Sequence, residues 1–224
     1  MKRYLLFVTA VVCVSIFHAC GKDDEPNKVV YRTVGLAQEI HISDITGSHP
    51  DISDVAFVAR VHMPPGVHAA PTGDVRVMLH LPFDRKETRL ILPENPPQAL
   101  LNNITKDIPE GFAISDTDAN TISFVEIACN LDDTNTFSAF LYLGRTVGDT
   151  RYKVTYVYCD RPVTITGSGE NWWGLPLVYD LSMQKGWNIV VEKTAYDAES
   201  QTTTVSNQMP NAIKWHYDRW IGGR

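Results

Sequence analysis

The feature that most constrains this chain is a series of short runs with apolar side chains at every second position. Such runs extend from Val55 to Met63 and from Val75 to Leu81. A period of two places these side chains on one face of a β-strand, so both runs are predicted strands. The prolines and glycines between residues 64 and 73 favour turns. We therefore expect an antiparallel pair with a long connection.

Similar runs continue along the chain, and turn-forming residues separate them. The further predicted strands cover residues 30–36, 89–92, 121–129, 136–143, 152–158, 163–166, 177–181, 187–193, 202–205 and 213–217. Many short strands at this spacing, with no helical stripe, predict an all-β fold. We expect an antiparallel β-sandwich of the Ig-like or transthyretin-like kind.

Residues 93–120 interrupt this series of predicted strands with Pro96, Pro97, Pro109 and several Asp and Asn residues. Only residues 98–104 favour a brief helical turn there. The interruption leaves two organisations open. Either an N-terminal β region (29–110) precedes a C-terminal β-sandwich region (111–224), or residues 28–224 form a single domain.

The N-terminus has the pattern of a secretory signal. Lys2 and Arg3 precede a run from Tyr4 to Phe17 that is almost entirely apolar. A membrane-spanning helix needs about 20 apolar residues, whereas the apolar region of a signal peptide has about 7–15. We therefore predict that residues 1–19 are a signal peptide that is removed.

Cys20 stands three positions after the end of this run, between Ala19 and Gly21. The arrangement resembles the lipobox of bacterial lipoproteins, although Phe17 and His18 stand where that family prefers an aliphatic and a small residue. The resemblance implies that Cys20 carries fatty acyl chains such as palmitate and begins the mature chain. Two or more acyl chains hold a protein stably on a membrane. The resemblance thus implies that this protein is attached to a membrane through its acyl chains.

After Cys20 and Gly21 the chain continues with Lys22, Asp23, Asp24 and Glu25. A lysine followed by acids at this place resembles the export signal of Bacteroidota surface lipoproteins. The resemblance implies that residues 20–28 are a lipidated tether and that the protein is held at the outer membrane, facing the cell surface. Taken from the residues alone, the same run also fits a solvated acidic linker.

The charge and the cysteine content of the chain limit its possible partners and its possible disulfides. The chain has a formal net charge of −6 and no basic cluster, which argues against nucleic acid as a partner. With Cys13 in the signal peptide and Cys20 lipidated, Cys129 and Cys159 remain. Cys129 is the last residue of one predicted strand, and Cys159 directly follows another. Two interpretations stay open for them: a disulfide, which an exported protein can form, or two separate buried thiols.

The C-terminal part carries a second resemblance. The segments "YVYCDRPVTITG", "YDLSMQKGWNIVVEKT" and "AIKWHYDRW" resemble β-sandwich modules of Bacteroidota surface lipoproteins. The resemblance implies a fold and a setting, whereas most such modules have no assigned function. Within these strands, we expect Trp187 and Trp215 to lie in the core.

Two patterns match metal sites only in part. Asp116, Asp118 and Asn120 match the first ligands of a calcium loop, but Thr121 and Ile127 occupy the positions of its glycine and its final carboxylate. We expect an Asx-rich turn instead. Histidines also cluster in the N-terminal half, without a short ligand spacing, and are expected at the surface: His41, His49, His62, His68 and His80.

The strongest sign of a binding site is the Gly-rich segment that contains Trp172 and Trp173, preceded by Glu170 and Asn171. In a loop, at least one of these indoles is expected to be exposed, where it would stack on a sugar ring or contact a protein partner. The alternative is that both rings fold back over the end of the sandwich as a lid.

The sequence thus predicts a lipid-anchored cell-envelope lipoprotein that acts as a non-catalytic binding or structural module, for a glycan or an envelope protein. No metal or cofactor is predicted. No catalytic residue is predicted either, since no hydrolase motif such as Gly-x-Ser-x-Gly is present. The alternative is a carbohydrate-processing enzyme whose carboxylates lie on loops. A cleft with two converging carboxylates would favour the enzyme.

Overall fold

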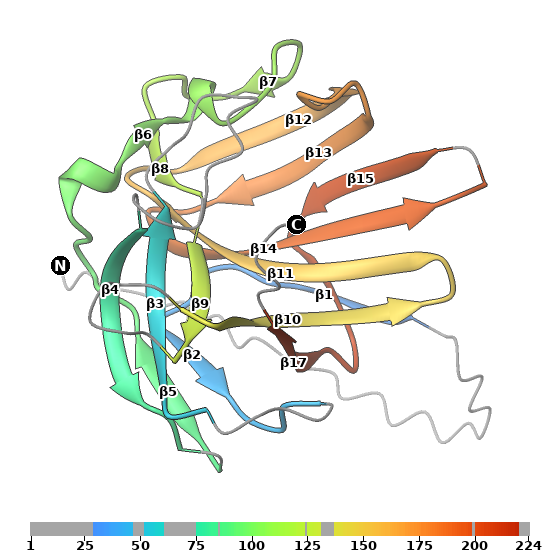
Figure 1. Ribbon diagram of the computed structural model, residues 1–224. Coiled ribbons are helices and arrows are strands. Elements are labelled where there is room, and N and C mark those ends of the chain that lie inside the picture. Colours follow the sequence, from blue (N-terminus) through green and yellow to red (C-terminus); the bar gives the residue numbers. More distant parts are fainter. Residues whose placement is uncertain are drawn as a thin grey trace, which may run out of the picture.

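The computed structural model describes residues 29–46, 52–60, 75–84, 86–123, 125–130, 137–198 and 200–219 (Figure 1). The predicted signal peptide, Cys20 and the tether lie outside these residues. Within them the chain is almost entirely β, with two short 3-10 turns as its helical elements. The predicted all-β, sandwich-like fold is therefore confirmed. No helix in the described part is long and apolar enough to cross a membrane.

The elements follow the sequence in three groups. The first group is β1 (Tyr31–Thr33), β2 (Glu39–Ile42), β3 (Asp54–Arg60), β4 (Val75–Pro82) and β5 (Thr88–Ile91). The second group is η1 (Gln98–Leu100), β6 (Asn102–Asn103), η2 (Ile104–Lys106), β7 (Ala113–Ile114), β8 (Asn120–Ile122) and β9 (Val125–Cys129). The third group is β10 (Ala139–Val147), β11 (Thr150–Cys159), β12 (Val163–Glu170), β13 (Pro176–Met183), β14 (Gly186–Tyr196), β15 (Gln201–Ser206), β16 (Gln208–Pro210) and β17 (Lys214–Arg219).

One large sheet contains most of these strands, in the order β4-β3-β9-β10-β11-β14-β15-β13-β12-β7. Neighbours are antiparallel except for β13 and β15, which run parallel. Figure 1 shows β10 to β15 extending across the molecule, while β3, β4 and β9 cross them steeply at one end. Strands from the first part of the chain thus share a sheet with strands from its last part.

The sheet divides at β10. Residues Ala139 to Leu141 of β10 pair with β9, whereas Leu143 to Val147 pair with β11. Because one edge of β10 changes partner at Tyr142, β9 and β11 diverge there. The predicted strand over residues 121–129 is split for the same reason: β8 pairs with β11, and β9 pairs with β3 and β10.

Two main apolar clusters fill the interior. The larger one contains Phe57, Trp187 and Trp215, and the small sheet of β2 and β5 packs against them. Trp187 and Trp215 are only 3% and 5% exposed, as the sequence predicts. Each indole N–H donates to a backbone carbonyl, of Pro93 and His41 respectively, both at 2.8 Å. The smaller cluster lies against β11 to β15 and borders the candidate site.

Candidate functional site

A cavity of about 560 Å³ lies on one face of β11, β14, β15, β13 and β12. We call it the Trp cavity, because Trp172 and Trp173 line it. Its volume falls within the range of roughly 300–1,000 Å³ that is typical of ligand pockets. Most of its wall is aliphatic and includes Val157, Leu177, Leu181, Met183, Val190 and Val205.

Strand register explains how this wall forms. On β13 the residues Leu177, Tyr179, Leu181 and Met183 alternate with others, so they share one face. Val205 of β15 lies between Tyr179 of β13 and Glu192 of β14 in the pairing register. A phenol, an aliphatic side chain and a carboxylate therefore form one row across three strands, and all three line the Trp cavity.

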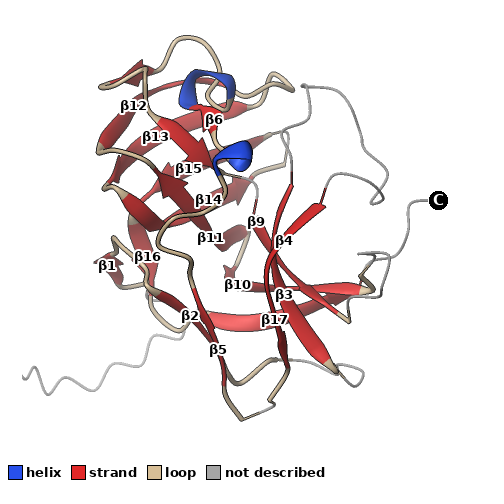
Figure 2. Ribbon diagram, turned by 90° about the vertical axis from the view of Figure 1, so that its left-hand side faces the viewer, coloured by secondary structure: helices blue, strands red, loops and turns tan. Residues whose placement is uncertain are grey.

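Residues 102–123, here called the cap segment, attach to both edges of this five-strand region. β7 pairs with β12, and β8 pairs with β11. Between these strands, Ile104 and Ile108 are buried in the smaller apolar cluster. Figure 2 shows the two 3-10 turns beside β6, at the end of the molecule where β12 and β13 lie. The cap segment thus supplies the wall opposite the sheet.

Asp107 is the acidic residue of the cap segment that lines the cavity. Its Oδ2 accepts hydrogen bonds from Thr121 Oγ1 at 2.9 Å and from Ser123 Oγ at 2.6 Å. These bonds join the turn after η2 to the strand that pairs with β11. They therefore fix the Asp107 carboxylate at the cavity wall.

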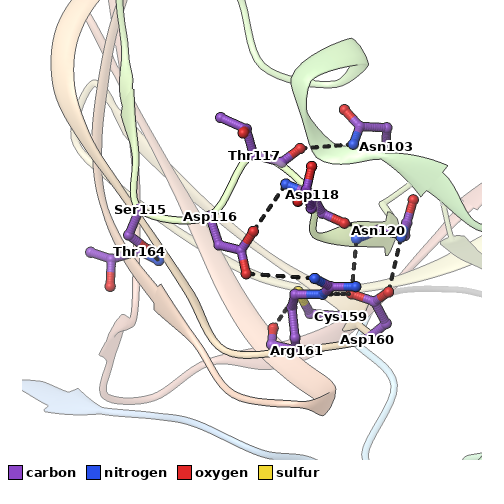
Figure 3. Close-up of polar contacts among 10 residues, drawn as sticks. All are labelled: Asn103, Ser115, Asp116, Thr117, Asp118, Asn120, Cys159, Asp160, Arg161 and Thr164. Atoms are coloured by element: carbon purple, nitrogen blue, oxygen red, sulfur yellow. Dashed lines mark hydrogen bonds and ion pairs between the residues drawn. The ribbon is translucent and has the colours of Figure 1, made fainter.

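A polar network outside the cavity holds the cap segment on the sheet (Figure 3). Asp160, at the end of β11, accepts from the backbone N–H and from Nδ2 of Asn120, both at 2.9 Å. Arg161 lies 3.2 Å from Asp160 and 3.8 Å from Asp116. The Asp116 Oδ1 accepts from the N–H of Asp118, which closes the predicted Asx turn. No group of three metal-binding side chains occurs among the described residues.

The hairpin turn between β12 and β13 carries the two tryptophans. Asn171 Oδ1 accepts from the backbone N–H of Trp173 at 2.9 Å and of Leu175 at 3.0 Å. Gly174 has a φ of +73°, a left-handed conformation that suits glycine. Because Asn171 builds the turn, Trp172 and Trp173 project outward and are 47% and 70% exposed. They lie at the mouth of the Trp cavity rather than forming a buried lid.

The charged residues that line the Trp cavity are acidic. Its charged lining residues in the described part are Asp107 and Glu192, and no lysine, arginine or histidine lines it there. Burial, and then the negative charges of Glu192 and Asp107, raise the pKa of Tyr179 to about 12. The phenol therefore keeps its proton near neutral pH and can donate a hydrogen bond.

A second cavity of about 470 Å³ lies where β9 and β11 diverge, and it shares Thr155 with the Trp cavity. Its lining is of mixed charge, with Glu126 and Asp218 beside Arg151 and Lys153. The Arg151 guanidinium lies over the Tyr142 ring, 5.3 Å from its centroid. Because acidic and basic groups both line this second cavity, its charges do not indicate one class of ligand. The Trp cavity is therefore the better-defined candidate site.

The structure does not bring the other predicted site residues together in one site. Glu170 is exposed at the end of β12 and does not line the Trp cavity. Cys129 and Cys159 form no disulfide: both thiols are free and buried, in two different apolar clusters. The alternative of two separate buried thiols therefore describes them. Burial and then Asp54 raise the pKa of Cys129 to about 12, so this thiol keeps its proton near neutral pH.

Two of the five clustered histidines lie within the described residues, and three lie outside them. His41 and His80 are exposed and lie 3.2 Å from Glu87 and 3.0 Å from Asp54, respectively. His49, His62 and His68 lie outside the described residues. Asp107, Tyr179 and Glu192 were not predicted from the sequence, because no local motif joins them. Strand pairing and the cap segment bring them to one cavity.

A comparison of the chain with protein-family models, with curated proteins and with solved structures finds no match.

Proposed function

We propose that the protein is a non-catalytic binding module that takes a small molecule or a glycan end into the Trp cavity. The observation that carries this proposal is the cavity of about 560 Å³, which has an aliphatic wall and two exposed tryptophans at its mouth. Natural ligand pockets combine such walls with a few polar groups that orient the ligand. Asp107, Tyr179 and Glu192 are those groups here.

The setting of this module is part of the same proposal. The lipobox-like residues around Cys20 and the lysine and acids after it support a lipid anchor and a position on the cell surface. A module held at the surface would meet glycans and envelope proteins. Trp173 offers a flat, exposed ring for a sugar or for a side chain of a partner protein.

A thermal-shift screen of the purified protein against glycans and small molecules tests the binding role. Val205→Phe is the matched variant, because a larger side chain at this position fills the cavity between Tyr179 and Glu192. We expect compounds that raise the Tm of the wild type and leave the Tm of folded Val205→Phe unchanged. Hits that stabilise both proteins equally would place binding elsewhere and contradict the proposal.

A carbohydrate-processing enzyme is the second candidate, because Asp107 and Glu192 line the same cavity. Paired carboxylates are what glycoside hydrolysis requires. Hydrolysis of p-nitrophenyl glycosides by the wild type, abolished in both Asp107→Asn and Glu192→Gln, would establish this activity. Absence of hydrolysis with retained ligand binding would favour the binding module.

A further inference from the structure

The charged residues that line the Trp cavity in the described part have the same sign. Both of its described charged groups are carboxylates, one on the cap segment and one on β14. Asp107 already accepts two hydrogen bonds from hydroxyl groups. Glu192 differs: within the described structure, its carboxylate forms no hydrogen bond and no ion pair, although the residue is half-buried.

The base nearest to Glu192 in the strand register is Lys153 on β11. Lys153 lines the second cavity rather than the Trp cavity, and the two side chains form no ion pair. The charges that act on Tyr179 are those of Glu192 and Asp107, and both raise its pKa. The charged side chains that line the Trp cavity in the described part are therefore both negative. An anionic ligand would be repelled, and an unpaired carboxylate beside an aliphatic wall favours a cation.

Trp172 and Trp173 reinforce this preference at the mouth. The face of an indole ring attracts ammonium groups, and tryptophan does so more strongly than the other aromatic side chains. The aliphatic wall in turn favours an apolar body.

We propose that the Trp cavity binds an amphipathic organic cation, in which an ammonium group pairs with Glu192 and an apolar body contacts the aliphatic wall. This inference rests on the proposed binding function and specifies its ligand class. Neutral amphiphiles bind more weakly, because they leave Glu192 unpaired. Amphiphilic anions are excluded.

Three probes with the same eight-carbon chain test this ligand class: octylamine, octyl glucoside and octanoate. Their affinities for the purified protein are measured by isothermal titration calorimetry at neutral pH, below the critical micelle concentration of each. We expect octylamine to bind about tenfold or more tightly than octyl glucoside, and octanoate not to bind. Glu192→Gln should weaken octylamine binding about tenfold or more and leave octyl glucoside within about twofold. Glu110→Gln is the matched control, since it removes an exposed acid outside the cavity and should change neither affinity.

The outcomes separate this inference from the function on which it rests. Equal affinity for the three probes, or an unchanged octylamine affinity in Glu192→Gln, overturns the cation preference and leaves cavity binding intact. Failure of octylamine to bind also overturns it. The binding function itself is tested separately, and it fails if no compound of the wider screen depends on Val205 for its effect. If Glu192→Gln is unstable, Glu192→Asp serves instead and should weaken octylamine by moving the carboxylate away from the ligand.

Discussion

Asp160 accepts two hydrogen bonds from Asn120, one from the backbone N–H and one from Nδ2, each 2.9 Å long. The pair joins the end of β11 to the start of β8. Because β8 belongs to the cap segment, this contact helps to hold the cap over the Trp cavity.

Replacing Asp160 with Ala should destabilise the fold by about 1–3 kcal/mol, because two donors of Asn120 lose their acceptor and Arg161 loses an ion-pair partner. Urea denaturation measures this free energy of unfolding. Asp118→Ala is the matched control in the neighbouring Asx turn, since its carboxylate forms no hydrogen bond in the described structure. It should change stability by less than about 0.5 kcal/mol. Equal losses in both variants would contradict the role of Asp160.

The same carboxylate predicts a pH dependence. Burial opposes ionisation of Asp160, but hydrogen bonds from Asn120 and Arg161 outweigh it and lower the pKa of Asp160. Its stabilising effect is therefore complete above the unfolded-state pKa of about 3.9 and is lost as the pH falls through the lower folded-state value. The difference in urea midpoint between wild type and Asp160→Asn should shrink as the pH falls from 5 towards 2. A difference that is constant over this range would show that the charge is irrelevant.

Truncating the tryptophans should affect stability according to their exposure. Trp173→Ala should cost less than about 1 kcal/mol, because 70% of this side chain is exposed. Trp187→Ala should cost about 3–5 kcal/mol, because it removes a buried ring that packs against Phe57 and Tyr158 at centroid distances of 5.1 and 5.4 Å. Thermal unfolding of both variants checks the contrast. A large loss for Trp173→Ala would mean that this ring is buried as a lid.

The period-two pattern was sufficient to predict most of the strands. Leu177 and Leu181 on β13 alternate with more exposed residues, as a half-buried strand requires. β3 differs from the prediction of a half-buried strand, because both of its faces are buried: Phe57 and Ala59 lie in one apolar cluster, and Ala56 and Val58 lie in another. The break after Ile122 could not be predicted in this way. It arises because β8 and β9 have different partner strands, and partners are set by tertiary structure rather than by local sequence.

The candidate site was only partly predictable. The adjacent tryptophans stand out in the sequence because a Gly-rich turn exposes large rings. Asp107 and Glu192 are 85 positions apart in the numbering and have no motif around them. Their shared cavity depends on the order β11-β14-β15-β13-β12 and on the cap segment that joins both edges. Those long-range pairings leave no local signal.

Replacing Cys20 with Ser should abolish metabolic labelling with a palmitate analogue and release the protein from the membrane fraction, because the thiol is the proposed site of acylation. Labelled protein is detected after cell fractionation. Cys13→Ser lies in the proposed signal peptide and should leave labelling unchanged. Continued labelling of Cys20→Ser would contradict the anchor.

The most direct test of the central claim is the fluorescence of N-phenyl-1-naphthylamine, a neutral apolar probe that brightens in an apolar site. Titrated into the purified wild type, it should bind saturably to one site. Folded Val205→Phe should bind it at least about tenfold more weakly, because the larger side chain occupies the Trp cavity. No saturable binding, or equal binding by both proteins, would contradict the claim that this cavity is a ligand site.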